Sequence, residues 1–245
     1  MIIKNFTMGR AFEYRKARKM ARWSKMATTF TRIGKEIAMA VKSGGPNPDS
    51  NTRLRIAIQG AKTANMPLVN VEKAIKKASN KEEKEFEEIV YEGYGPNGVA
   101  IIVETATDNP TRTVANIRTA FNKCHGSMGN SGSVDYLFEH KVFFKVELAG
   151  MNQEDLELEL IDFGREEILE EDGETFIQVS FIDFGKMQGA LDSLKISILA
   201  ADKERIPVSN KEGLSEEQIS EVNKLLERLE EDDDVQAVFH NMDES

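Results

Sequence analysis

The sequence has one cysteine, no long apolar run and no segment typical of a secretion signal. With Cys124 alone among 245 residues, an internal disulfide is excluded, and a reducing compartment such as the cytoplasm fits this composition. The most apolar run, Val99–Val103, is far shorter than the roughly 18 residues of a membrane-spanning helix. The first ten residues lack the apolar stretch of a signal peptide. We therefore expect a cytoplasmic protein with no membrane partner.

Side chains that could form a catalytic or metal-binding site are also scarce. Three histidines accompany Cys124, and its neighbour His125 is too close in sequence for the two to bind one metal ion well. Asp-Phe-Gly occurs at 162–164 and 183–185, but without the glycine-rich loop and His-Arg-Asp sequence of a protein kinase. We interpret the first copy as the end of a helix at Gly164, and the second as the start of one with Asp183 as its N-cap. We predict a protein with no catalytic residue, metal, cofactor or small-molecule substrate.

Charge is abundant and is divided very unevenly along the chain. Residues 1–80 contain 17 Lys and Arg against 4 Asp and Glu, whereas residues 81–245 contain 15 against 38. The first part is therefore strongly basic, although the whole chain has a formal net charge of −10. Such a division indicates a polyanion, above all nucleic acid, as the partner of the basic part. The alternative is that the two parts neutralise each other within the molecule.

The first 80 residues have the apolar spacing of helices. Apolar side chains recur every three or four positions in three stretches, which are interrupted at Ser43–Asn51 and at Met66-Pro67. The inward positions that this spacing predicts are Trp23, Met26, Phe30, Ile33, Ile37 and Val41 in the first helix, Leu54, Ile58 and Ala61 in the second, and Val71, Ala74, Ile75 and Ala78 in the third. The pattern predicts a small basic helical bundle.

Lysine and arginine side chains of this bundle and of the segment before it are the nucleic-acid contacts that we predict. Such cations bind a phosphate backbone by releasing condensed counterions. The predicted contacts are Arg10, Arg15, Lys16, Arg18, Lys19, Arg22, Lys25, Arg32, Lys35, Arg53, Arg55, Lys62, Lys76 and Lys77. Trp23 lies on the apolar stripe, so we assign it to the core rather than to base stacking.

Beyond residue 81 the apolar period becomes that of strands alternating with helices. We predict strands on either side of a turn at Gly93–Gly98, then a helix that begins at Asp108 or Asn109. Further strands are predicted at 134–140, 141–147, 173–181 and 195–200, with helices at 152–164 and 183–194 and a last helix and strand within 214–241. This order predicts an α+β fold with mostly antiparallel sheets.

One loop of the second part has the composition of a contact surface. Gly126–Ser133 consists almost entirely of small and polar residues, which predicts a long flexible loop with an exposed Met128. Its predicted contact residues are Ser127, Met128, Gly129, Asn130 and Ser131.

Three strings of residues resemble one known family. "NTRLRIAIQGAKTANMP…NVEKAIKKA", "YEGYGPNGVAIIVETATDNPTRTVANIR" and "GSVDYLFE" resemble the YebC family, whose mitochondrial relatives include a translational activator of cytochrome c oxidase. The resemblance implies three domains: a helical domain of residues 1–80, a middle α+β domain of 81–138 plus 206–245, and an α+β domain of 139–205 inserted in the middle one.

The resemblance also implies a function in gene expression, in one of two forms. Family members are described as DNA-binding transcriptional regulators and as ribosome-associated translation factors that relieve stalling, for example at proline-rich stretches. We prefer the translation factor, with ribosomal or transfer RNA and the ribosome as partners, and keep the DNA-binding transcriptional regulator as the alternative. A third hypothesis is an adaptor whose basic bundle binds an acidic protein.

Overall fold

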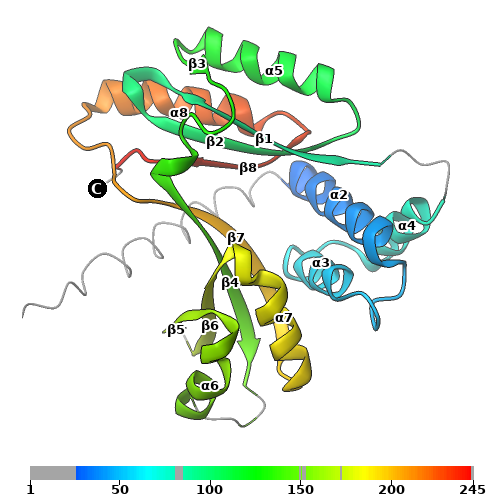
Figure 1. Ribbon diagram of the computed structural model, residues 1–245. Helices are drawn as coiled ribbons and strands as arrows, with labels where there is room; N and C mark the ends of the chain where they lie inside the picture. Colours follow the sequence, from blue (N-terminus) through cyan, green and yellow to red (C-terminus); the bar gives the residue numbers. More distant parts are fainter. Residues whose placement is uncertain (1–25, 81–84, 149, 151–152, 172, 244–245) are drawn as a thin grey trace, which may run out of the picture.

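The structure is a computed structural model that describes residues 26–80, 85–148, 150, 153–171 and 173–243. Within these residues the chain forms seven α-helices and two antiparallel four-stranded sheets (Figure 1). The helices are α2 (Met26–Gly44), α3 (Thr52–Thr63), α4 (Leu68–Ala78), α5 (Pro110–Lys123), α6 (Gln153–Leu160), α7 (Phe184–Ser193) and α8 (Glu216–Glu230). The strands are β1 (Glu87–Tyr94), β2 (Ala100–Thr107), β3 (Ser127–Met128), β4 (Phe138–Glu147), β5 (Arg165–Glu171), β6 (Glu174–Ser180), β7 (Ser197–Pro207) and β8 (Val235–His240). The predicted α+β class is confirmed.

Helices α2, α3 and α4 form the predicted bundle around a small apolar core. Ile37, Leu54 and Val71, one from each helix, are all buried there. Asn51 fixes the turn between α2 and α3: its side-chain oxygen accepts a hydrogen bond from the Leu54 N–H, while its amide nitrogen donates to two carbonyls at the end of α2. Such a cap stabilises a helix by about 1 kcal/mol. Trp23, which we assigned to this core, lies outside the described residues.

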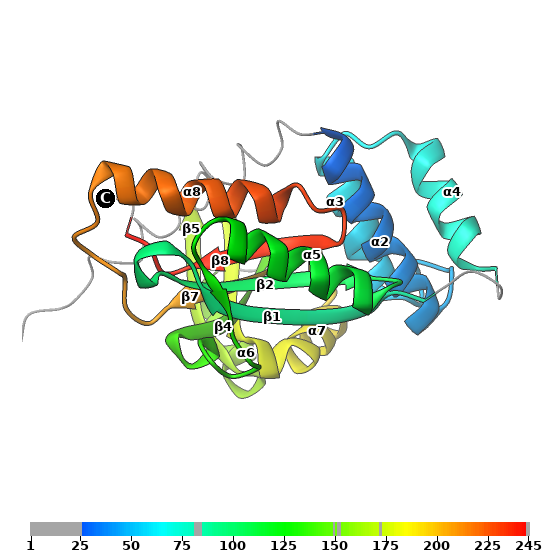
Figure 2. The same ribbon diagram turned by 90° about the horizontal axis from the view of Figure 1, so that it is seen from above.

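The first sheet has the strand order β3-β1-β2-β8. β1 and β2 form a hairpin through the short 3-10 turn η1 (Pro96–Gly98), and β8 returns from the end of the chain to pair antiparallel with β2. Helices α5 and α8 lie side by side over one face of this sheet (Figure 2). Their inward side chains, among them Phe121 and Leu225, meet Ile101 and Val103 of β2 in the largest apolar core.

The second sheet has the order β5-β6-β4-β7, with α6 following β4 and α7 following β6. This β-α-β-β-α-β sequence is the split βαβ arrangement. The two helices pack on one face, where Phe144, Leu156, Ile177 and Leu191 form the core. The first Asp-Phe-Gly copy ends the helical segment of α6 and the short turn η3 (Ile161–Phe163), where Gly164 adopts a left-handed conformation, as predicted. The second copy begins α7, also as predicted, with Asp183 at the end of η4 (Phe181–Asp183).

Three local expectations differ from the structure. The two strands that we predicted over 134–147 are the turn η2 (Asp135–Leu137) followed by one strand, β4. Strands β3 and β5 are absent from the prediction; the four glutamates and one arginine of "REEILEE" conceal the alternation of β5. Asp183 stands at the N-cap of α7 but its side chain makes no capping hydrogen bond. The division into three domains stays a prediction.

Candidate nucleic-acid interface

Lys35 attaches the helical bundle to the rest of the molecule. Its Nζ lies 2.7 Å from Asp234 Oδ1, and it donates to the carbonyl oxygens of Ala106 at 2.9 Å and Asp233 at 2.7 Å. All three donors of the ammonium group are thus used, and Lys35 is 8% exposed. We had predicted Lys35 as a phosphate contact; this placement removes it from the contact set, because its charge is buried and paired inside the protein.

Asp234 is the acceptor that joins several elements at this point. Its Oδ2 accepts hydrogen bonds from Arg112 at 2.6 Å, Thr113 at 2.8 Å and Thr107 at 3.1 Å. Burial alone would raise the pKa of this carboxyl, but the donors Lys35, Arg112 and Thr113 outweigh burial and lower the pKa to about 2. The string "TDNPTRT", which contributes to the family resemblance, contains three of the residues that hold Asp234.

Three more of the predicted contacts also face the acidic part of the chain. Arg32 donates to the carbonyl oxygen of Glu230 at 2.8 Å, Arg53 pairs with Glu88 at 2.8 Å, and Arg55 pairs with Asp192 at 2.9 Å. On this side of the bundle, charge is neutralised within the molecule, which was our alternative explanation of the charge division. The Arg53 and Arg55 pairs are roughly half exposed, so they stabilise little and their cations can still meet phosphate.

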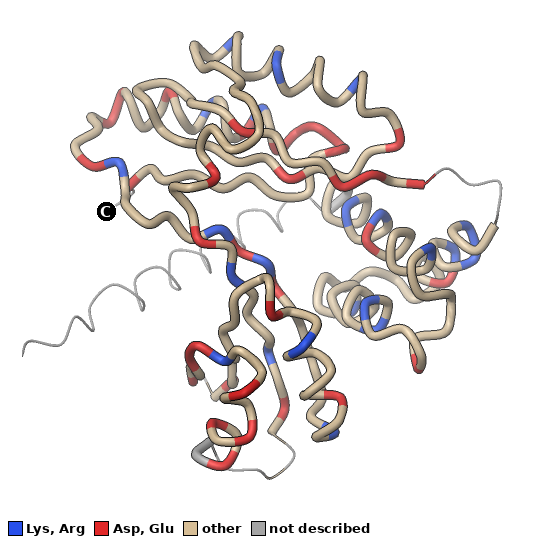
Figure 3. Tube along the Cα trace, in the orientation of Figure 1, with Lys and Arg blue, Asp and Glu red and all other residues tan. Residues whose placement is uncertain are grey.

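The remaining described contacts lie on surfaces of the bundle that point to solvent. Lys62 of α3 and Lys76 and Lys77 of α4 are exposed, and Lys73 adds a fourth exposed ammonium group on α4. Figure 3 shows Lys and Arg positions along the tubes of the helical bundle. Lys62, Lys73 and Lys76 form no ion pair with another described residue. The exposed cations Lys62 of α3 and Lys73, Lys76 and Lys77 of α4 are here together named the outer bundle face.

The other seven predicted contacts lie outside the described residues and stay predictions. They are Arg10, Arg15, Lys16, Arg18, Lys19, Arg22 and Lys25. They belong to the most basic segment of the sequence and precede α2 directly.

The loop at Gly126–Ser133 is anchored rather than flexible. Its start pairs with β1, and the buried carboxylate of Glu92 accepts hydrogen bonds from the backbone N–H groups of Gly132, Val134 and Asp135 at 2.7 to 2.9 Å. Burial would raise the pKa of Glu92, but these three donors lower it below its ordinary value. Met128 is half-buried against the main core, so the prediction that it is exposed is wrong.

The other four predicted contact residues of this segment are accessible to solvent. Ser127, Gly129, Asn130 and Ser131 are solvent-exposed. The close approach of β3 also requires glycine at position 93, because a Cβ atom there would lie 2.5 Å from the Ser127 carbonyl oxygen. The sequence analysis did not predict that Glu92 and Asp234 bind several segments together. Glu92 lies in one of the strings that carry the family resemblance, and Asp234 binds residues of another.

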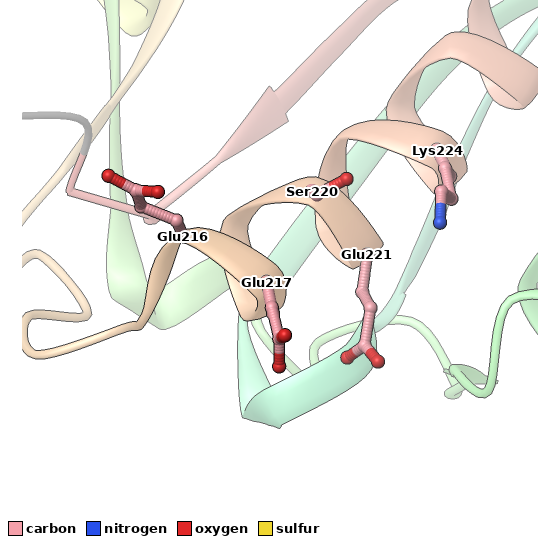
Figure 4. Close-up of a pocket in the computed structure, with 5 residues that line it drawn as sticks. All are labelled: Glu216, Glu217, Ser220, Glu221 and Lys224. Atoms are coloured by element: carbon pink, nitrogen blue, oxygen red, sulfur yellow. The ribbon is translucent and has the colours of Figure 1, made fainter.

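No small-molecule site is evident in the described part of the chain. A shallow hollow lies on α8, lined by Glu216, Glu217, Ser220, Glu221 and Lys224 (Figure 4). All five side chains come from one helix, so no opposite wall encloses a ligand. Among the described residues, no group of three or more His, Cys, Asp or Glu side chains could hold a metal ion, and no helix is long and apolar enough to cross a membrane.

Comparison with known proteins covers nearly the whole chain. The family model for the TACO1/YebC protein N-terminal domain matches residues 10–81, and that for the TACO1/YebC second and third domain matches residues 86–242. Proteins named "Probable transcriptional regulatory protein" from Flavobacterium johnsoniae and Porphyromonas gingivalis are 57% and 54% identical over 97% of this chain, and cover 100% and 98% of their own lengths. A crystal structure of a conserved hypothetical protein from Aquifex aeolicus is 39% identical, with a TM-score of 0.69 over 89% of this chain and 90% of that one.

Proposed function

The chain belongs to the TACO1/YebC family, and from this premise we propose that it is a non-enzymatic, cytoplasmic regulator of gene expression that binds nucleic acid, with DNA as its target. The names of its relatives support transcriptional regulation, our alternative, more than the ribosomal role that we had preferred from the sequence. The translation factor is retained as the competing outcome of the experiment below.

The observation that carries the proposal is the outer bundle face. Lys62, Lys73 and Lys76 are exposed without an ion pair to any described residue, while the cations on the opposite side of the bundle are used to attach it. An exposed group of unpaired cations binds phosphate favourably because condensed counterions are released. Such binding is independent of base sequence, so it supplies affinity rather than a choice of site.

The acidic remainder of the chain would direct nucleic acid to this face. Residues 81–245 carry 38 Asp and Glu, and their field repels phosphate from most of the two sheets and their helices. The buried Lys35–Asp234 pair would hold the bundle in one orientation relative to these acids. The basic segment before α2 would add further phosphate contacts.

The test is to compare duplex DNA, structured RNA and intact ribosomes as partners of the full chain. Binding to DNA and RNA of equal length is measured by fluorescence anisotropy at several salt concentrations, and ribosome binding by sedimentation with and without nuclease. Tightest binding to duplex DNA supports the proposal. Preferential, nuclease-sensitive sedimentation with ribosomes would replace it by the translation factor, and salt-independent or absent binding to every nucleic acid would favour the protein adaptor.

A further inference from the structure

Helix α5 and the segment after it are free of acids, in contrast to their surroundings. Residues 109–134 contain Arg112, Arg118, Lys123 and His125 but no Asp or Glu, whereas the other residues of 81–245 contain all 38 acids of that part. The outward positions of α5 are instead threonine, alanine, asparagine and cations. These 26 residues therefore carry a positive charge, whereas residues 81–245 as a whole are strongly acidic.

The neighbouring helix shows that the fold does not require this composition. α8 lies beside α5 on the same sheet face and contributes to the same apolar core. Yet α8 carries Glu216, Glu217, Glu221, Glu227 and Glu230 on its sequence. Two helices in equivalent layers therefore present opposite charge to solvent, as the tube in Figure 3 shows.

Intramolecular roles account for only some of the cations on α5. Arg112 pairs with Asp234 and Asp108, so it belongs to the attachment of the bundle. Lys123 is in the last turn, where a cation interacts favourably with the helix dipole. Arg118 is in neither position: it is exposed, it has no acid within four residues along the helix, and it makes no ion pair with another described residue.

Four acids around this helix make hydrogen bonds or ion pairs within the protein. Asp108 and Asp234 at its N-terminal end pair with Arg112, and the Asn116 amide donates to Asp232 at 2.8 Å. The carboxylate of Glu92, below the loop that follows, accepts three backbone N–H groups. On α5 itself, phosphate approaching the outer side would meet Arg118, Lys123 and neutral polar groups, because residues 109–134 contain no Asp or Glu.

We infer that the outer face of α5, comprising Arg118, Asn122 and Lys123, is a second surface for the phosphate backbone of the nucleic acid that the bundle binds. This inference rests on the proposed function. A helix of 14 residues is about 21 Å long, enough to follow several phosphates. Its N-terminal end lies at Asp234, which also binds Lys35 of the bundle, so the two surfaces belong to one rigidly connected body.

The experiment compares two double variants that remove the same charge. In the full chain, Arg118→Ala with Lys123→Ala changes α5, and Lys224→Ala with Arg228→Ala changes exposed positions of α8. Binding to a duplex DNA of fixed length is measured across a salt series. The α5 variant is expected to lower the slope of log affinity against log salt by about 1.5 and to weaken binding about tenfold at 0.15 M salt, whereas the α8 variant changes neither.

Each other outcome has a defined meaning. Equal losses in both variants would show that only overall charge matters and would overturn the inference. No loss in the α5 variant, with loss in a variant of the outer bundle face, would overturn the inference and leave the proposed function standing. If the wild-type chain binds no nucleic acid, both fail. Circular dichroism melting confirms that the variants, all at exposed positions, remain folded.

Discussion

Lys35 and Asp234 are 199 residues apart in sequence, and their charged groups lie 2.7 Å apart in a buried ion pair. This pair connects the first helix of the basic bundle to the residue that precedes β8, the strand formed by the end of the chain. The most basic and the most acidic parts of the protein are thus held together by a charge that is not available to a partner.

We predict that Lys35→Met destabilises the protein without affecting nucleic-acid binding. Without the Lys35 ammonium group, the buried carboxylate of Asp234 loses a charged partner. This loss lowers the free energy of unfolding by about 3 kcal/mol. Lys62→Met, at an exposed position, should show the converse: unchanged stability and a salt slope smaller by about 0.8. Urea unfolding and anisotropy titrations on both variants check this. A Lys35 variant of normal stability with a reduced salt slope would return Lys35 to the contact set.

Acid should weaken the same junction. The pKa of Asp234 is lowered from 3.8 to about 2, so its ionised form stabilises the fold above pH 4, and this contribution is lost as the pH falls toward 2. The contribution is about 2 kcal/mol. The stability difference between wild type and Asp234→Asn should therefore shrink between pH 4 and pH 2. Asp233→Asn, the exposed neighbour, is the control; a difference that is constant with pH would show that the carboxylate charge is not what stabilises the junction.

Glu92→Gln should loosen the loop that follows β3. In glutamate, Oε2 accepts hydrogen bonds from the N–H groups of Val134 and Asp135. In glutamine one of the two oxygens is replaced by an NH2 group, which donates hydrogen bonds and cannot accept them from these N–H groups. We expect faster hydrogen exchange at Gly132, Val134 and Asp135, corresponding to about 1–3 kcal/mol of local stability. Glu87→Gln, exposed on the same strand, should change nothing. Unaltered exchange in the Glu92 variant would mean that the strand pairing of β3 alone holds the loop.

The basic segment before α2 gives a prediction from its sequence alone. At helical spacing Arg15, Arg18, Arg22 and Lys25 form one ridge, so Arg18→Ala with Arg22→Ala should lower the salt slope by about 2 and weaken binding to all sequences alike. Lys186→Ala with Lys224→Ala, which removes the same charge from the acidic part, is the control. If the arginine variant binds like wild type, this segment does not touch nucleic acid.

The sequence predicted those features that depend on local periodicity and turn chemistry. The stripe of Ile33, Ile37 and Val41 is buried as expected, and Asn109 caps α5 with its side chain. The function of Lys35 could not be predicted in the same way. A stripe shows which side of a helix packs within its own bundle, but it does not show that a second side meets an aspartate 199 residues later.

Glu92 illustrates the same limit for the loop. Small polar residues correctly indicate a loop, but they carry no information about a carboxylate on another strand that binds its backbone. The role of such an acid follows only from strand register and burial, which depend on the whole fold. The uneven distribution of charge, by contrast, can be read directly from the sequence. The structure adds which of the cations form ion pairs within the molecule.

The most direct test of the central claim is the salt dependence of DNA binding by the full chain and by one variant of the outer bundle face. Lys73→Ala, Lys76→Ala and Lys77→Ala together should lower the slope of log affinity against log salt by about 2 to 3, while the matched variant Lys186→Ala, Lys211→Ala and Lys224→Ala leaves it unchanged. Equal slopes for wild type and both variants would contradict the account, because the exposed cations of α4 would then have no part in binding.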